Sequence, residues 1–363
     1  MTHPLAATTH DATLGDIHAA ALESLPLDVH DYLEGGAGEE WTLRRNREAF
    51  AEWGFVPRLM SGRPTPDLRT VFMGVPLRMP ILTGPFGVDT LFHPEGQKAV
   101  ARAAARSGIS GMAPEAGSYS YAEVRRAAPD GMAFGQLHPV GSEDAFIRRL
   151  AHFEDCGFRA LVVTCDTPTA GWRERNRRNG YTPPHAVTGG NFTGGEGTGD
   201  AFADLFGGSG PAWTWEKLAR LMSGTSLPWM AKGITTVPDA EAAIAAGASA
   251  IGVSNHGGRQ LDGLPAALDV LPEIADAVGG RAQIAFDSGV RRGSDVVKAL
   301  ALGADVVVLG RLAIYGLIAD GEAGVTRVLG LLSGEMANIL TLLGCAALTD
   351  LDRGFLRPLR QSR

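Results

Sequence analysis

Two stretches of the chain, AIAAGASAIGVSNHGG at residues 243–258 and ALALGADVVVLGRLA at residues 299–313, share one pattern. Each begins with helical residues, passes through Gly-Ala into a short apolar run, and ends in a turn of polar residues and glycine. The apolar runs are too short for helices and lack the strict alternation of half-exposed strands. They are typical of strands buried in a parallel sheet, so each stretch is interpreted as one unit of a parallel α/β fold.

Runs of this kind occur eight times from residue 79 onward. They are residues 79–85, 109–114, 132–137, 160–166, 227–233, 249–255, 282–289 and 305–311. Amphipathic helical patterns separate them, and several of these patterns end at a glycine, as helix C-termini often do. Eight such units predict a TIM (β/α)8 barrel, with a doubly wound open sheet as the less favoured alternative.

Two segments fall outside the repeat. Residues 1–78 form an N-terminal extension with helical patterns, which we expect to pack on a barrel of residues 79–363 within a single domain. Residues 181–212 are rich in glycine and lie between the fourth and fifth strands. A long loop in that place leaves from the face of the barrel that carries active sites. It is therefore predicted to be a mobile lid, with a disordered insertion as the alternative.

The composition limits the classes of function. The chain has 33 basic and 40 acidic residues, a net charge of −7, which argues against broad nucleic-acid binding. Its three cysteines are widely spaced and indicate neither a disulfide framework nor a metal site. No apolar run approaches the roughly 20 residues that cross a bilayer, and the N-terminus lacks a secretory pattern. We expect a cytoplasmic protein with no metal and no membrane or nucleic-acid partner.

Polar and ionisable residues terminate most of the eight runs, at the strand ends where a TIM barrel carries its chemistry. The most informative block is SNHGGRQ at residues 254–260. His256 can act as a general base near neutral pH, and Arg259 offers a planar fork for a carboxylate. A single histidine in a loop is more often structural. Its grouping on one rim with Asp166 and Lys232 favours a functional site.

This block resembles the signature of the FMN-dependent α-hydroxy-acid oxidases and dehydrogenases, such as glycolate oxidase, lactate oxidase, lactate monooxygenase and mandelate dehydrogenase. The resemblance extends from about residue 15 to 358 and includes, in family order, DYLEGGAGEEWTLRRNREAF, HPEGQKAVARAAARSG, TCDTPTAGWRERNRRNGY and FDSGVRRGSDVVKALALGADVVVLGR. It implies FMN-dependent oxidation of an (S)-2-hydroxy acid to the 2-oxo acid, with the flavin reoxidised by O₂ or another acceptor. It also implies a homo-oligomer, often a tetramer.

The resemblance assigns roles at the substrate. His256 matches the catalytic base, and Asp166 matches the carboxylate that supports its protonated form. Arg173 and Arg259 match the pair that holds the substrate carboxylate. Tyr32 matches a tyrosine that hydrogen-bonds the substrate, which would bring the N-terminal extension over the mouth of the barrel.

The resemblance also assigns the FMN site. Lys232 matches a lysine beside the flavin ring, where a fixed cation stabilises the anionic reduced form. A salt-bridged lysine at the rim is the structural alternative. Asp287 matches the residue that binds the ribityl chain, and the phosphate falls to Gly289, Arg291, Gly310 and Arg311. The remaining positions that match flavin contacts are Pro85, Phe86, Gly87, Gln136, Thr164, Ser254 and Ser288.

The chain departs from the family at several positions. His138 stands where these enzymes usually have a tyrosine that contacts the substrate, and Pro114 stands where many have a flavin-contacting serine. Phe86 replaces a small polar residue, and Gly87 is alanine in several oxidases. These changes leave the base, the arginine pair and the phosphate site in place. His138 could bind a second anionic group of the substrate, although a neutral imidazole that replaces the hydrogen bond of the missing phenol is favoured.

Two other functions stay open at this point. One is a flavoenzyme of the same scaffold that acts on a non-standard hydroxy acid in natural-product tailoring, which the departures at the cavity wall favour. The other is a non-redox phosphate-binding barrel. Lys232 and the intact phosphate positions argue against this alternative.

Overall fold

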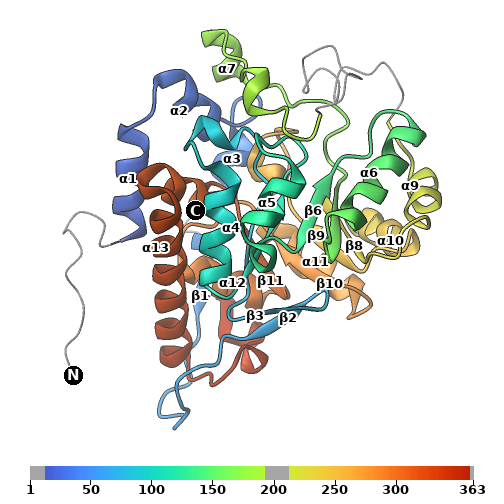
Figure 1. Cartoon of the computed structure of the whole chain (residues 1–363). Helices are drawn as coiled ribbons and strands as arrows, with labels where there is room; N and C mark the ends of the chain where they lie inside the picture. Colours follow the sequence, from blue (N-terminus) through green and yellow to red (C-terminus); the bar gives the residue numbers. More distant parts are fainter. Residues whose placement is uncertain (1–12, 193–211, 360–363) are drawn as a thin grey trace.

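The computed structural model describes residues 13–192 and 212–359. Eight parallel strands form a closed barrel in which chain neighbours pair, and the last strand closes on the first (Figure 1). The strands are β4 (Ile81–Thr83), β5 (Ser110–Ala113), β6 (Phe134–Leu137), β7 (Ala160–Thr164), β8 (Trp229–Ile234), β9 (Ala250–Val253), β10 (Gln283–Phe286) and β11 (Val306–Leu309). The predicted TIM barrel is confirmed.

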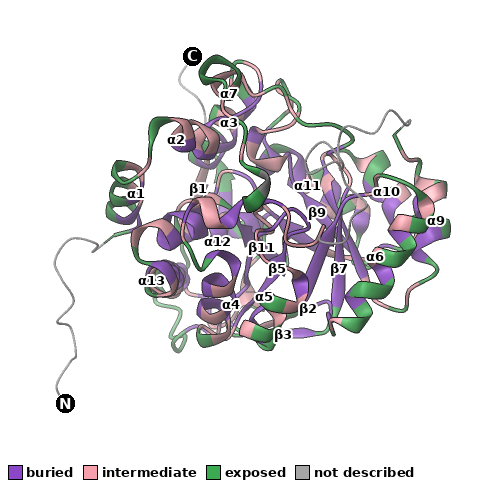
Figure 2. Ribbon diagram, turned by 45° about the horizontal axis from the view of Figure 1, so that its top comes forward, coloured by how far each residue is buried: buried purple, intermediate pink, exposed green. Residues whose placement is uncertain are grey.

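Helices cover the outside of the barrel, and at least one helix follows each strand in the sequence. They are α4 (Gly96–Arg106), α5 (Tyr121–Ala127), α6 (Glu143–Asp155), α9 (Trp215–Met222), α10 (Val237–Ala245), α11 (Ala267–Val278), α12 (Gly293–Ala301) and α13 (Arg311–Leu343). Several begin at a serine or threonine cap; Thr236, for example, accepts from the backbone N–H of Asp239. Figure 2 shows the strands buried and the exposed residues on the outer helical faces. No helix within the two described ranges is long and apolar enough to cross a membrane.

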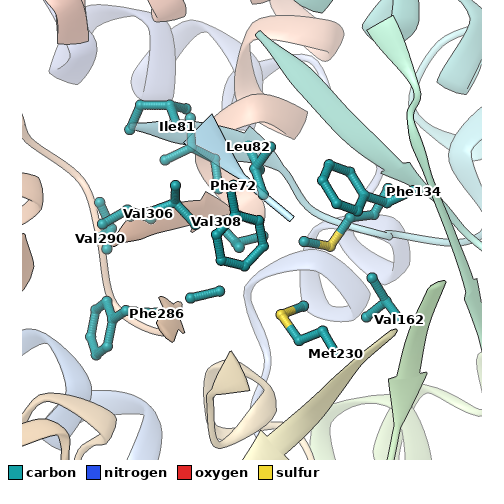
Figure 3. Packing of buried hydrophobic residues seen from close by; sticks show 14 of the residues in the cluster. Phe72, Ile81, Leu82, Phe134, Val162, Met230, Phe286, Val290, Val306 and Val308 are labelled. Carbon is teal, nitrogen blue, oxygen red and sulfur yellow. The ribbon is translucent and has the colours of Figure 1, made fainter. Parts of the chain in front are cut away.

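A hairpin closes the end of the barrel at which the strands begin. It consists of β2 (Thr70–Phe72) and β3 (Val75–Leu77), which pair antiparallel. Phe72 is fully buried, with its ring 6.1 Å from that of Phe134 at the start of β6 (Figure 3). The backbone N–H of Met73 donates to the side chain of Gln283, the first residue of β10. The hairpin therefore covers the end of the barrel at which the strands begin, and a functional site is expected at the opposite end.

The N-terminal extension reaches that opposite end. It contains α1 (Leu14–Glu23), α2 (Leu27–Glu34) and α3 (Trp41–Glu48), and Figure 1 shows α2 at the top of the view while β2 and β3 cross the bottom. Asn46 of α3 exchanges two side-chain hydrogen bonds of 2.8 Å with Asn255, which follows β9. A second attachment joins β1 (Trp53–Phe55) to β12 (Leu356–Pro358) near the C-terminus. These contacts join the extension to the loop after β9 and to the C-terminal strand β12.

The predicted lid is described only in part. Residues 193–211 lie outside the described ranges. Within 181–192, the Val187 carbonyl accepts from Ser118 Oγ, and Gly190 N–H donates to the Gly117 carbonyl. This part of the segment packs on the loop after β5, at the same end of the barrel as α7 (Glu174–Asn179). A mobile lid over residues 181–212 stays a prediction.

Candidate active site

A cavity of about 220 Å³ opens at the C-terminal ends of the strands. All eight strands, or the loops that follow them, contribute to its wall, together with the end of α2. The predicted site residues that line it are Tyr32, Pro85, Phe86, Gly87, Gln136, His138, Thr164, Arg173, Lys232, His256, Arg259, Asp287, Ser288, Gly289, Arg291, Gly310 and Arg311. The other two, Asp166 and Ser254, lie behind this wall, where they hydrogen-bond His256 and Lys232.

His256 and Asp166 form a pair between two strand ends. Asp166 follows β7 and His256 follows β9, and His256 Nδ1 lies 3.1 and 3.2 Å from the two carboxylate oxygens. Gly233 lies at a bulge in the intervening strand β8 and makes room for the carboxylate, because a Cβ there would lie 2.5 Å from Asp166 Cγ. Since Nδ1 is engaged by Asp166, a substrate in the cavity would meet Nε2.

Charges around this pair favour an ionised Asp166 and a neutral His256. Burial opposes ionisation of Asp166, but His256 and Lys232 outweigh it and hold the pKa of the carboxyl below its ordinary range. Burial also lowers the pKa of His256, and Lys232 and Arg173 reinforce this against the attraction of Asp166. A neutral imidazole held in this way is ready to accept a proton, and the carboxylate stabilises the imidazolium that results.

Arg173 and Arg259 both lie against Tyr32. Their guanidinium carbons are 6.0 and 5.1 Å from the centroid of its ring. Arg259 Nη1 donates to the backbone carbonyls of Tyr32 and Gly35, which ties the loop after β9 to the end of α2. In the described part of the chain neither arginine forms a salt bridge. Burial and the charges of Arg173 and Arg311 lower the pKa of Arg259 well below its ordinary value, so a bound carboxylate would relieve an excess of positive charge.

Lys232 projects from β8 into a polar cluster. The strand extends beyond Lys232 to Ile234, slightly further than the apolar run at 227–233 predicts. Lys232 Nζ lies 3.1 Å from Ser254 Oγ and 3.4 Å from Asp287 Oδ2. Burial alone would lower the pKa of Lys232, but Asp287 and Asp166 outweigh it and raise the pKa above its ordinary value. The cavity therefore has a fixed cation in its wall.

The far end of the cavity suits a phosphate. Helix α13 begins at Arg311, and Gly310 before it has no side-chain cap and only open space where a Cβ would be. The first N–H groups of a helix attract an anion. Arg311 Nε donates to the Leu33 carbonyl at 2.8 Å, and Arg291 Nη2 donates to Tyr315 Oη at 3.1 Å. Both guanidinium groups are thereby fixed at the cavity wall.

The full set of donors and acceptors fits FMN. The start of α13 with Arg311, together with Arg291 from the loop after β10, suits a phosphate. Asp287 suits the hydroxyls of a ribityl chain, and Lys232 suits an electron-rich ring edge. Gln136 Nε2 donates to Thr164 Oγ1 at 2.9 Å, so an amide and a hydroxyl stand together for the polar edge of the ring. These residues lie on β6, β7 and β8, in the loop after β10 and at the start of α13, and together they would hold the flavin.

The loop after β4 forms an apolar part of the wall. Gln97 Nε2 holds the Phe86 carbonyl at 2.9 Å, and a Cβ on Gly87 would lie 2.4 Å from the Ala116 carbonyl oxygen. Glycine at position 87 is therefore required by the loop after β5. An alanine at this position would displace that loop.

The sequence analysis missed the partners of His138. His138 Nδ1 and its backbone N–H both lie 2.8 Å from Oε2 of Glu115, and Arg149 Nη1 lies 2.6 Å from Oε1 of the same carboxylate. Glu115 could have been found from the sequence, because it is an acidic residue just after the predicted strand at 109–114. Arg149 belongs to the ordinary helical pattern of α6, where nothing distinguishes it from a surface arginine. Gln260, which donates to the Asp166 carbonyl at 3.0 Å, was also missed.

The fold and the site define the class of protein. A (β/α)8 barrel with a helix start for phosphate, a buried lysine, and a histidine–carboxylate pair next to two arginines is a flavin-dependent oxidoreductase. Across the described residues, no three His, Cys, Asp or Glu side chains converge to hold a metal ion.

Comparison with known proteins identifies the family. Residues 21–358 match the FMN-dependent dehydrogenases. The chain is 38% identical over 343 residues to glycolate oxidase 3 of Arabidopsis thaliana, with 92% of each chain covered. It is 38% identical over 338 residues to an L-lactate oxidase of Nostoc, covering 90% of this chain and 92% of that one. A lactate oxidase structure from Pediococcus acidilactici matches with a TM-score of 0.89 at 37% identity, over 96% and 95% of the two chains. The protein belongs to the FMN-dependent dehydrogenase family, and the predicted FMN cofactor is confirmed at that level.

Proposed function

We propose that the protein oxidises an (S)-2-hydroxy acid to the 2-oxo acid and passes the electrons to O₂ or another acceptor. The observation that carries this is the convergence of the His256–Asp166 pair with Arg173 and Arg259 in the cavity that also contains Lys232. The relatives support it, because those named are glycolate and lactate oxidases. When bound, FMN supplies a ring that accepts two electrons from the carbon being oxidised.

The two arginines would bind and orient the acid. Each can donate two parallel hydrogen bonds to a carboxylate, and they lie against the same tyrosine ring. Binding of the carboxylate restricts rotation of the acid and would hold its α-carbon in one orientation beside His256. The Tyr32 ring is part of the cavity wall beside both guanidinium groups.

His256 would take the proton that the oxidation releases. Loss of two electrons from the acid is balanced by loss of two hydrogens, one from the α-carbon and one from the hydroxyl. If the α-hydrogen leaves with its electron pair to the flavin, Nε2 accepts the hydroxyl proton. If Nε2 accepts the α-proton instead, the electron pair and the hydroxyl proton would pass to the flavin. In both cases the positive charge on the imidazole forms 3.1 Å from Asp166.

The test is the variant His256→Gln, followed by anaerobic mixing with a set of (S)-2-hydroxy acids. We expect FMN to stay bound and the flavin absorbance to persist, because no base receives the proton. Wild-type protein mixed in the same way should lose its flavin absorbance with at least one acid. Fast reduction of the variant would refute the assignment of His256 as the base.

The acceptor and the assembly are part of the same proposal. Admission of air after reduction should restore the flavin absorbance and produce hydrogen peroxide if O₂ is the acceptor. The proposal also includes a cytoplasmic location and a homo-oligomer, which family resemblance suggests is a tetramer. Light scattering on the purified protein tests the assembly.

A further inference from the structure

The N-terminal extension holds the end of the cavity that is predicted to bind phosphate. Arg311 Nη2 donates to the Gly35 carbonyl at 2.9 Å, so the C-terminal end of α2 fixes this arginine. Gly289, in the loop after β10, has its carbonyl bound at 2.9 Å by Arg47 Nη1 of α3. A third residue of this end, Arg291, is connected to α2 through a side chain of α13.

That side chain is Tyr315, which links Arg291 to Glu34, the last residue of α2. Arg291 Nη2 donates to Tyr315 Oη at 3.1 Å, and Tyr315 Oη donates to Glu34 Oε1 at 2.6 Å. Tyr315 lies four residues after Arg311 on α13, so the two side chains are on the same face of the helix. Arg291 lines the cavity, and Tyr315 and Glu34 lie behind it.

The ionised state of Glu34 fixes the direction of these hydrogen bonds. Burial opposes ionisation of Glu34, but contacts with His18 and Tyr315 and two nearby arginines outweigh it and lower its pKa to about 2. A carboxylate has no hydrogen to donate, so the single hydrogen of the Tyr315 hydroxyl points to Glu34. The lone pairs of the same oxygen then face Arg291, and each hydrogen bond in such a series strengthens the next.

Tyr315 gives Arg291 a fixed reference within the fold. Arg291 Nη1 also donates to the carbonyl of its chain neighbour Val290 at 2.9 Å, but that contact moves with the loop. Tyr315 is fully buried, and its ring packs against His18 with the ring centroids 4.5 Å apart. It belongs to the helix whose first N–H groups face the predicted phosphate site. The hydroxyl of Tyr315 therefore holds Arg291 in a set position relative to these N–H groups.

We propose that Tyr315 and Glu34 are positioning residues that aim Arg291 at the phosphate of FMN, so that the N-terminal extension is part of the cofactor site. The inference rests on the proposed assignment of this cavity to FMN, and it does not depend on which acid is oxidised. Arginine binds phosphate through a planar fork of donors, so rotation of the guanidinium weakens the contact. Riboflavin has the same ring and ribityl chain as FMN but no phosphate. The positioning should therefore change the affinity for FMN relative to that for riboflavin.

Competition between the two flavins tests this proposal in the holoenzyme. The purified protein is equilibrated with an excess of FMN and riboflavin, unbound flavin is removed, and the bound flavins are released and quantified by chromatography. The bound ratio, divided by the ratio of the free concentrations, gives the relative affinity. We expect the wild-type protein to prefer FMN by at least about tenfold. A wild-type ratio near one would overturn the inference, because the phosphate would then contribute nothing.

Removal of the tyrosine hydroxyl should lower this preference. Tyr315→Phe keeps the ring, so the preference for FMN should fall by at least about fivefold while riboflavin binding is kept. Tyr119→Phe is the matched control, because Tyr119 Oη donates to the Pro94 carbonyl at 2.6 Å in the loops after β4 and β5. The control should leave the preference unchanged. If Tyr315→Phe weakens both flavins equally, the role of Tyr315 is merely structural and the inference fails.

A double-mutant cycle tests whether Tyr315 acts through Arg291. Arg291→Met should itself lower the preference for FMN, because the guanidinium is lost. In that background, the further substitution Tyr315→Phe should leave the ratio of the two affinities unchanged. Additive effects of the two substitutions would show that Tyr315 acts on the flavin by another path and would overturn the proposal.

Variants of Glu34 separate positioning from charge. Glu34→Gln keeps an oxygen that accepts from Tyr315 and removes a negative charge near the phosphate, so the preference for FMN should be kept or rise. Glu34→Ala removes the acceptor and should lower the preference by at least about threefold. A rise in both variants would show that the carboxylate acts only as a repelling charge, which would overturn its positioning role. If no 2-hydroxy acid reduces the wild-type flavin, the proposed function fails, and the flavin ratio, measured without turnover, still decides this inference.

Discussion

Replacement of Asp166 by asparagine should slow flavin reduction without loss of the cofactor. The amide oxygen can still accept from His256 Nδ1, so the orientation of the ring is kept and only the negative charge is removed. At 3.1 Å and an effective dielectric constant of about 20, the attraction between an imidazolium and a carboxylate is about 5 kcal/mol. If about half of the charge has developed in the transition state, the barrier rises by about 2.5 kcal/mol, which is roughly 70-fold in rate.

The assay is anaerobic stopped-flow reduction with a saturating 2-hydroxy acid, and the rate constant of the fast phase is compared between proteins. Thr167→Val is the matched control, because Thr167 Oγ1 donates to the same carboxylate at 3.1 Å and its loss removes one neutral hydrogen bond. That control should cost less than about tenfold. A rate for Asp166→Asn within threefold of wild type, with FMN fully bound, would refute the role of the carboxylate charge.

Two further predictions follow from particular contacts. The base form of His256 is neutral, and its pKa lies below the ordinary value of 6.5. In a stopped-flow pH profile, the rate constant of reduction divided by the dissociation constant should therefore stay level as the pH falls through 6.5 and decrease only at lower pH. A decrease that begins above pH 6.5 contradicts this. Gly87→Ala places a Cβ 2.4 Å from the Ala116 carbonyl oxygen and should destabilise the protein by about 1–3 kcal/mol in a thermal or urea melt. The control Gly334→Ala, in open space on α13, should be neutral or stabilising by up to about 1 kcal/mol. Equal effects of the two substitutions would contradict the steric argument.

The barrel and most of its cavity were predictable from the sequence because the fold repeats. Eight buried runs give eight strand ends on one face, so a polar residue near the end of a run, such as Lys232 or Asp287, faces the same space as the others. Tyr32, in the N-terminal extension, was predicted to lie at the cavity only from family resemblance. The periodicity of a sequence does not indicate where an extension packs on a barrel. In the structure its position follows from Arg259, which donates to the carbonyls at the end of α2.

The residues that sequence reasoning missed are those whose partners lie far apart in the chain. Glu115 follows β5 and Arg149 lies on α6, and the two meet only in the folded protein, where Arg149 Nη1 lies 2.6 Å from Glu115 Oε1. The steric need for Gly87 depends in the same way on the carbonyl of Ala116, a residue on the next loop. Such pairings are fixed by tertiary packing, which local spacing does not encode.

The distribution of charge in the cavity explains why its ligands should be acids. Three carboxylates near the wall have cationic partners, since Asp166 and Asp287 share Lys232 and Glu115 is bound by Arg149. In the described ranges Arg173 and Arg259 have no such partner, and burial of like charges side by side is unfavourable. The carboxylate of a 2-hydroxy acid supplies the missing charge beside His256, whose uncharged state avoids adding to the excess. Binding of the acid and readiness of the base therefore have one electrostatic cause, and any substitution that gives these arginines an internal carboxylate should weaken acid binding and raise the pKa of His256 together.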